Sequence, residues 1–242
     1  MPKRHLPDIT AYRVACSVSA PIRAAVVADF HNGSRLDLLS AIDSLSPDLV
    51  LIAGDMMDDT EKGGVNALRF LREVAEKYPT YYGLGNHERH FQEEDLAKVR
   101  ACGVHLLICT SERFGELSIG AVTGMLRDYQ ENEAFIEAFC REDGCKLLLC
   151  HRPEWYAKHH HLKEWREIDL IVSGHAHGGQ MRPLGIALYA PGQGIFPKYT
   201  SGVHDGRLII SRGLSNHVRL PRFWNPPELV CLELVPRTEN TP

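Results

Sequence analysis

The sequence has 242 residues, of which 44% are hydrophobic and 24% are charged. These values are ordinary for a globular protein and predict a single domain over residues 1–242 with a sizeable core. The formal net charge of −4 gives no electrostatic basis for non-specific binding of nucleic acid, so we expect no nucleic-acid partner.

Seven cysteines are scattered along the chain without a Cys-x-x-Cys pair. This pattern favours buried thiols in a reducing compartment over a disulfide framework. No apolar run approaches the roughly 18 to 20 residues that cross a bilayer, and no apolar signal core follows the charged start of the chain. We therefore expect a cytoplasmic protein. Peripheral membrane association and the oligomeric state are left open.

Strands and helices alternate over the first two thirds of the chain. Loose alternation and apolar runs predict strands over 9–18, 22–28, 49–53, 81–84, 104–109, 117–122, 146–150 and 170–172. Apolar residues at helical spacing predict helices over 34–46, 64–77 and 93–102 and around 135–139. We expect the strand over 117–122 to pair with that over 104–109.

Strands dominate the last third. Short strands are predicted over 186–189 and 208–210, with a tight hairpin turn at Asp205-Gly206, and a last strand over 229–235. Alternating helices and strands followed by strands alone predict a layered α/β fold with some antiparallel sheet.

Residue types that bind metals follow each strong predicted strand. They are Asp29, His31, Asp55, Asn86, His87, His151, His175 and His177. The carboxyl ends of strands in α/β sheets converge on one crevice, so these side chains can meet. Any one of them alone has an ordinary explanation, since an Asp caps a helix and an Asn occupies a turn. Together they exceed what one tetrahedral ion needs and suit two cations that share a carboxylate.

These residues lie in five motifs whose order spans most of the chain. The motifs are Asp29-Phe30-His31, Gly54-Asp55-Met56-Met57-Asp58, Gly85-Asn86-His87-Glu88, a lone His151, and Gly174-His175-Ala176-His177. This set resembles the calcineurin-like metallophosphoesterases. The following residues 178–180 and 222–228 resemble their small bacterial branch, some members of which act on cell-envelope phosphoesters. The resemblance implies a four-layer α/β/β/α sandwich of two mixed β-sheets flanked by helices.

The resemblance also implies a role for each ligand type. One divalent ion would be held by Asp29, His31 and His177, the other by Asn86, His151 and His175, with Asp55 bridging both. Imidazole with carboxylate suits manganese, iron and zinc alike. A hydroxide that bridges the two ions would attack the phosphorus in line with the leaving group.

Two further residues would complete the chemistry. His87 would face the phosphate and donate a proton to the leaving group, with Asp58 fixing its orientation. Alternatively, Asp58 and Asp59 simply begin the next helix. Arg89 and Arg152 each follow a site residue and are candidate substrate contacts, although long basic side chains are usually solvated.

One departure from the family bears on the substrate. Protein serine/threonine phosphatases of this superfamily carry an Arg directly after the Asp that matches Asp58, whereas this chain has Asp59. An acid there repels a dianionic monoester more than a monoanionic diester, so phosphodiesters are favoured. Residues 185–200 are expected to form part of the substrate pocket wall.

Two alternatives to a phosphoesterase stay open. A non-catalytic metal-binding scaffold on the same fold is disfavoured because no ligand is missing. A nuclease is disfavoured by the acidic balance and the lack of a basic stripe.

Overall fold

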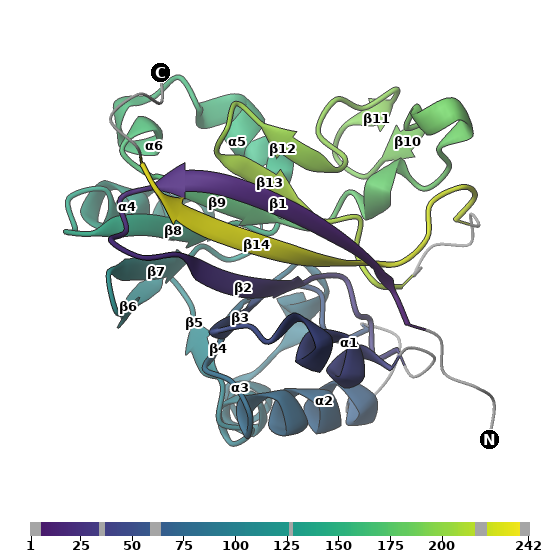
Figure 1. Ribbon diagram of the computed structural model, residues 1–242, viewed down its shortest axis with the longest axis horizontal. Coiled ribbons are helices and arrows are strands. Elements are labelled where there is room, and N and C mark those ends of the chain that lie inside the picture. Colours follow the sequence, from purple (N-terminus) through teal and green to yellow (C-terminus); the bar gives the residue numbers. More distant parts are fainter. Residues whose placement is uncertain (1–5, 34–36, 59–63, 126–127, 216–221, 238–242) are drawn as a thin grey trace.

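The computed structural model describes residues 6–33, 37–58, 64–125, 128–215 and 222–237. Two six-stranded sheets stack face to face (Figure 1). The first sheet contains, in spatial order, β1 (Asp8–Cys16), β14 (Glu228–Pro236), β2 (Ile22–Val27), β3 (Leu49–Ala53), β4 (Thr80–Gly83) and β5 (His105–Leu107). Strands β2 to β5 are parallel, whereas β14 runs antiparallel to β2 and parallel to β1.

The second sheet is also mixed. It contains, in spatial order, β12 (Gly202–His204), β13 (Leu208–Ile210), β9 (Leu170–Ser173), β8 (Cys145–Leu149), β7 (Leu117–Ala121) and β6 (Thr110–Phe114). The four inner strands are parallel and the two edge strands are antiparallel. A separate two-stranded ribbon pairs β10 (Tyr189–Ala190) with β11 (Gly194–Ile195).

Helices cover the outer faces of both sheets (Figure 1). The first sheet is covered by α1 (Leu38–Leu45), α2 (Val65–Ala75) and α3 (Glu93–Arg100), and the second by α4 (Tyr129–Phe139), α5 (Pro153–His159) and α6 (Lys163–Arg166). Short 3-10 turns occur at η1 (His87–His90), η3 (His177–Gly179) and η4 (Pro183–Gly185). The architecture is the four-layer α/β/β/α sandwich that the resemblance implies.

Each interface between layers has its own hydrophobic cluster, because successive side chains of a strand point to opposite faces. Val26 and Leu51 point between the sheets, where Leu147 meets them from the second sheet. Their neighbours Val27 and Ile52 point outward and pack under α1 and α2. Both faces of the central strands are therefore buried, which explains why the sequence shows continuous apolar runs there.

Most predicted elements are confirmed, with three corrections. The predicted pairing of 117–122 with 104–109 is wrong: β5 pairs with β4 in the first sheet, whereas β7 lies between β6 and β8 in the second. The chain changes sheets at Cys109, whose φ is 48°. The predicted strand over 186–189 is reduced to β10, and helices α5 and α6 and strands β6 and β11 were not predicted. The first residues of the predicted helix 34–46 fall partly outside the described residues.

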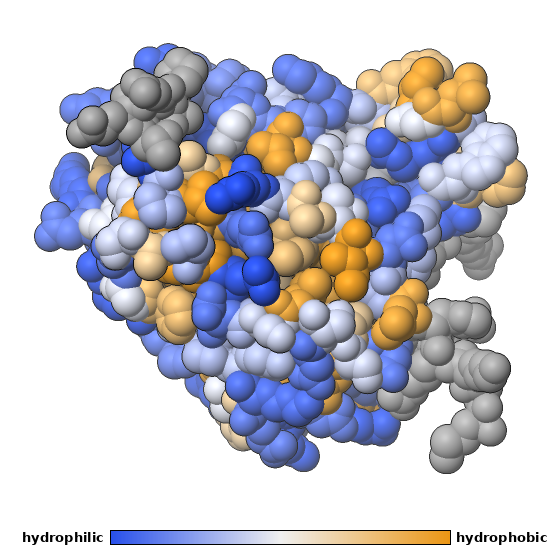
Figure 2. Space-filling model, in the orientation of Figure 1, coloured by the Kyte–Doolittle hydropathy of each residue, from blue (hydrophilic) through white to orange (hydrophobic). Residues whose placement is uncertain are grey.

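The surface in Figure 2 is mostly hydrophilic; hydrophobic side chains appear across the middle of this face, where β1 and β14 run, and gather again at the upper right over the segment of β10 and β11. Among the described residues, none of the helices combines the length and the apolarity that crossing a bilayer requires.

Candidate metal centre

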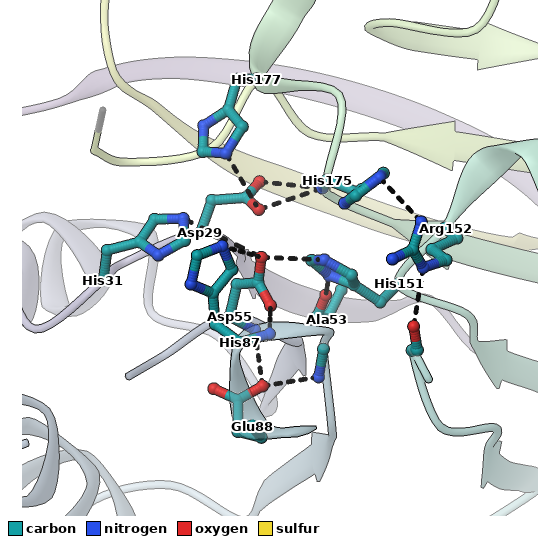
Figure 3. A network of polar contacts seen from close by, with 12 residues as sticks. Asp29, His31, Ala53, Asp55, His87, Glu88, His151, Arg152, His175 and His177 are labelled. Carbon is teal, nitrogen blue, oxygen red and sulfur yellow. Dashed lines mark hydrogen bonds and ion pairs between the residues drawn. The ribbon is translucent and has the colours of Figure 1, made fainter. Parts of the chain in front are cut away.

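The turns that follow β2, β3 and β4 meet those that follow β8 and β9 at one edge of the sandwich (Figure 3). Among the described residues, three groups have ligand-type atoms within 4.8 Å of one another: Asp29, His31 and His177; His31, Asp55 and His87; and Asp55, His151 and His175. Residues from Asp29 to His177 thus gather in one place, as the motifs predict. The groups share members, so they form one continuous centre.

The backbone of this centre is strained. Five predicted ligands have a positive φ: Asp29 (53°), His31 (45°), Asp55 (54°), His175 (66°) and His177 (45°). Such left-handed conformations are unfavourable for residues other than glycine and concentrate at functional sites. Backbone hydrogen bonds hold them: the N–H of Asp29 donates to Gly54 O (3.1 Å) and that of His31 to Asp55 O (3.1 Å).

Two glycines are required by close approach. A Cβ on Gly54, whose φ is 89°, would lie 2.6 Å from His151 Nδ1. A Cβ on Gly85 would collide with the carboxylate of Asp55. Gly54 therefore lets the turn after β3 approach the second sheet, and Gly85 lets the turns after β3 and β4 of the first sheet approach each other.

The carboxylate of Asp29 joins the two sheets. It accepts hydrogen bonds from the backbone N–H of His175 at 3.0 and 3.1 Å. His177 Nε2 lies 3.9 Å from Asp29 Oδ1, and His177 Nδ1 lies 3.3 Å from Ser215 O. Because a carbonyl only accepts, Nδ1 carries the proton and the Nε2 lone pair of His177 faces the Asp29 side.

Asp55 Oδ2 lies among three imidazoles. His151 Nε2 is 3.1 Å away, and the Nε2 atoms of His31 and His87 are each 3.9 Å away. His151 Nδ1 lies 2.7 Å from Ala53 O, so this nitrogen carries the proton of the neutral ring. The lone pairs of His151 Nε2 and Asp55 Oδ2 then face each other, an arrangement that a proton or a metal cation between them must stabilise.

The electrostatics favour metal-binding protonation states for most of these groups. Burial alone would raise the pKa of Asp55, but His151, His31 and His87 hold this pKa well below its usual range. Burial lowers the pKa of His175 and of His177, so both rings are neutral. Burial alone would lower the pKa of His151, but Asp55 raises it to about 9. A cation that binds there displaces a proton.

The residues present fit divalent cations of the manganese, iron or zinc type. Carboxylate oxygens and imidazole nitrogens are their usual ligands. Within the described part of the chain, Asn86 Oδ1 is buried and accepts no hydrogen bond. Its lone pairs are therefore available to coordinate a metal ion.

The structure places the predicted catalytic pair on neighbouring turns. His87 begins η1, and its backbone N–H donates to Asp55 Oδ1 at 2.8 Å. Asp58 is half-buried, follows β3 and lines a cavity of about 70 Å³ together with Phe91. The residue on which the diester preference rests, Asp59, lies outside the described residues. The orientation of His87 by Asp58 stays a prediction.

The two arginines predicted to contact substrate differ in their surroundings. Arg89 is exposed, and its Nε lies 3.0 Å from His90 Nε2. Arg152 is half-buried and donates from Nε to Gly124 O at 2.7 Å. Its Nη1 also lies 3.2 Å from His175 Nε2, at the margin of the centre (Figure 3).

Sequence reasoning assigned no role to Glu88, which is fully buried beneath the centre. Its carboxylate accepts hydrogen bonds from the backbone N–H groups of Asp55 (3.1 Å), Met57 (3.0 Å) and Gly85 (2.7 Å). It thereby fastens the turn after β3 to the turn after β4. Burial and the Asp55 carboxylate raise the pKa of Glu88. The sequence feature that could have indicated a role for Glu88 is its position in the Gly-Asn-His-Glu motif, directly after His87.

Glu154 was also missed. Its Oε1 lies 3.4 Å from His175 Nε2 and 3.1 Å from Arg152 Nη1. If His175 donates from Nε2 to this carboxylate, its Nδ1 lone pair is left for a metal; if it accepts from Arg152, Nδ1 carries the proton. Only the first tautomer makes His175 a ligand. Apart from its position three residues after His151, nothing in the sequence pointed to Glu154.

Carboxylates and imidazoles gather at one edge of a two-sheet α/β/β/α sandwich. This combination of fold and candidate ligands is typical of metal-dependent hydrolases. A family model described as calcineurin-like phosphoesterase matches residues 22–179, more than half of the chain. The chain belongs to the calcineurin-like phosphoesterase family. This family implies divalent metal binding and hydrolase chemistry, and the sequence-based identification is confirmed.

Several proteins are similar over most of this chain. An uncharacterized metallophosphoesterase of Campylobacter jejuni is 29% identical over 88% of this chain and 59% of its own length. One from Helicobacter pylori is 27% identical over 90% of this chain and 61% of its own length. The chain thus spans about three fifths of these relatives. The phosphodiesterase YaeI of Escherichia coli is 28% identical over 90% of this chain and 83% of its own length.

A solved structure supports the fold. The sulfate thiohydrolase SoxB of Thermus thermophilus, in complex with glycerol, superposes with a TM-score of 0.50 over 97% of this chain and 59% of that protein, at 12% identity. At this identity the likeness concerns the fold alone.

Proposed function

We propose that this chain is a dinuclear metal-dependent phosphoesterase that prefers phosphodiesters to phosphomonoesters. The observation that carries the proposal is the overlap of the ligand groups. One group matches the set predicted for the first ion, another contains Asp55, His151 and His175 of the second, and a third links them through His31 and Asp55. When bound, two divalent cations supply the hydroxide nucleophile and neutralise charge on the phosphoryl oxygens.

In this proposal the first ion is held by Asp29, His31 and His177. The second is held by Asn86, His151 and His175, and Asp55 contacts both. Manganese, iron and zinc are equally suited to these ligands. Carbonyl groups of Ala53 and Ser215 orient two of the imidazoles, which raises the basicity of the opposite nitrogen.

The chain's own residues then act on the substrate. His87 donates a proton to the leaving oxygen, and Asp58 orients the imidazole ring. Arg152 and the exposed Arg89 are proposed to contact the non-bridging oxygens. Two observations support a diester: Asp59 stands where an Arg would grip a monoester, and one relative is named a phosphodiesterase.

Metal analysis of the purified protein, combined with hydrolysis of a chromogenic diester and the matched monoester, tests the proposal. We expect about two metal ions per chain, faster hydrolysis of the diester, and complete loss of activity with a chelator. Metal binding without hydrolysis of either ester would favour a non-catalytic scaffold. Salt-dependent binding and cleavage of DNA or RNA would favour a nuclease.

A further inference from the structure

The surface beside the metal centre carries an unusual set of exposed apolar side chains. We call this set the apolar rim; it consists of Leu184, Ile186, Tyr189, Ile195, Phe196, Phe223 and Trp224. Leu184 is 97% exposed, Phe196 70% and Trp224 65%. Single exposed apolar residues are normal, but a group of them marks an interaction surface. Figure 2 shows hydrophobic side chains gathered over the segment of β10 and β11.

The rim is built from two segments that are held together. Met181 bridges to Phe223, the N–H of Arg182 donates to Phe223 O at 2.9 Å, and that of Phe223 donates to Gln180 O at 3.2 Å. The aromatic rings of Phe223 and Trp224 are 4.4 Å apart. The side chains are thus displayed by a bonded scaffold.

The backbone of the rim shows a second unusual feature. Leu184, Phe196 and Trp224 have φ values of 53°, 51° and 52°. The left-handed region is a genuine outlier for bulky side chains. Unfavourable conformations of this kind persist where function requires them. Here they hold three large apolar side chains in water, where a partner surface would cover them.

The rim borders the metal centre on two sides. Asn225, directly after Trp224, donates from Nδ2 to His177 O at 2.7 Å. Gly192, in the turn between β10 and β11, lies so close to Glu154 that a Cβ would collide with its carboxylate. Glu154 in turn lies 3.4 Å from His175 Nε2. A partner on the rim would therefore lie next to the metal centre.

The charge of the rim identifies the kind of partner. Residues 181–200 and 222–227 contain no acidic residue, although the whole chain has a net charge of −4. Arg182 and Arg222 are half-buried and donate to backbone carbonyl groups, which leaves Lys198 as the exposed cation of these two segments. Lys198 is exposed, and its Nζ lies 4.9 Å from the centre of the Tyr199 ring. Aromatic and aliphatic side chains beside an exposed lysine, with no acidic residue in the same segments, match the boundary between acyl chains and anionic head groups.

We infer that the apolar rim docks this protein onto an anionic lipid surface, with the metal centre facing the head groups. Leu184, Phe196 and Trp224 would enter the acyl boundary, and Lys198 would contact the lipid phosphates. The inference concerns binding alone, so it can succeed or fail independently of phosphoester hydrolysis.

Vesicle flotation tests the inference. The probes are vesicles of phosphatidylcholine alone and vesicles that contain about one third phosphatidylglycerol. We expect binding to the anionic vesicles that weakens as salt is raised. The triple variant Leu184→Asn, Phe196→Asn and Trp224→Asn should bind at least tenfold more weakly. Asn tolerates a positive φ, so the backbone is preserved.

The matched control is the double variant Leu6→Asn and Val65→Asn, which changes side chains that are 62% and 63% exposed elsewhere on the molecule. It should bind vesicles as the parent does. Unfolding midpoints of all variants should agree closely, because only exposed side chains change.

Tryptophan fluorescence gives an independent readout. Of the three tryptophans, Trp155 and Trp165 are buried and Trp224 is exposed. Anionic vesicles should shift the emission to the blue, and Trp224→Asn should abolish the shift. The inference is overturned if the parent does not bind, if neutral vesicles bind it as well as anionic ones, or if the triple variant binds equally. Dimerisation through the rim without vesicle binding would also overturn it.

Discussion

The two sheets contribute different chemistry to the metal centre. Both carboxylates among the candidate ligands, Asp29 and Asp55, follow strands of the first sheet. The second sheet contributes imidazoles alone, and burial keeps His175 and His177 neutral. Neither sheet carries a complete site, so the hydrophobic packing between the sheets also assembles the chemistry. Four predictions test this division.

The largest effect is expected from the one carboxylate that both ions would share. Asp55→Asn should remove both ions and reduce hydrolysis by at least about a thousandfold, roughly 4 kcal/mol of barrier. His151→Ala, on the second sheet, should remove only one ion. Metal content per chain and diester hydrolysis measure both effects, with the exposed Asp143→Asn as the control. Equal metal loss in the two variants would contradict the shared role of Asp55.

Substitution of His87 should lower the rate of hydrolysis without changing the metal content. His87→Ala should lower the rate by about a hundredfold to ten-thousandfold, the usual range for a lost general acid, while both metals stay bound. Metal analysis and the rate for a diester with a poor leaving group measure the two effects. Metal loss in this variant would instead make His87 a ligand, as its grouping with His31 and Asp55 allows.

The turns of the first sheet should depend on Glu88. Glu88→Gln removes a charged acceptor from three backbone N–H groups and points an amide N–H₂ at some of them. We expect a loss of about 2–3 kcal/mol in the free energy of unfolding, measured by urea denaturation. Glu94→Gln, whose parent side chain is 82% exposed, should change it by less than about 0.5 kcal/mol. Equal effects of the two substitutions would show that Glu88 does not stabilise the turns after β3 and β4.

The smallest expected effect is a loss of stability at high pH, through a hydrogen bond beside the second sheet. The Tyr156 hydroxyl donates to Asp205 at 2.9 Å, and burial with this bond raises the pKa of Tyr156 to about 12. An unfolded tyrosine titrates near pH 10. The stabilisation, about 1 kcal/mol for one such bond, is therefore complete below pH 10 and is lost as the pH rises through about 12. Tyr156→Phe should remove this dependence in urea denaturation at increasing pH.

That the candidate ligands gather in one place could be predicted from the sequence, because they follow buried strands. Continuous apolar runs locate β2, β3, β8 and β9, and whatever follows a parallel strand lies at one edge of its sheet. Nothing in those runs indicates which sheet a strand joins. The strand over 104–109 therefore appeared to pair with 117–122, although the polar strand β6 between them is the true partner of β7. Helices α5 and α6 were missed because charged and histidine residues surround the buried Trp155 and Trp165, so the segment shows no clear apolar periodicity.

The supporting contacts could not be predicted in the same way. Glu154 and Ser215 approach His175 and His177 through turns whose path depends on tertiary packing. The positive φ values of Asp29, His31 and Asp55 likewise reflect bonds between distant segments. Such details depend on long-range geometry and leave no periodic pattern along the chain.

The position of β14 has a consequence for biosynthesis. This strand lies between β1 and β2, so a segment near residue 230 fills a gap between two segments that are synthesised long before it. Until it arrives, β1 has no neighbour and β2 exposes an unpaired edge, the kind of surface that recruits other chains. The first sheet therefore cannot be completed until β14 has been synthesised, and the order of synthesis leaves this edge open for most of the time in which the domain is made.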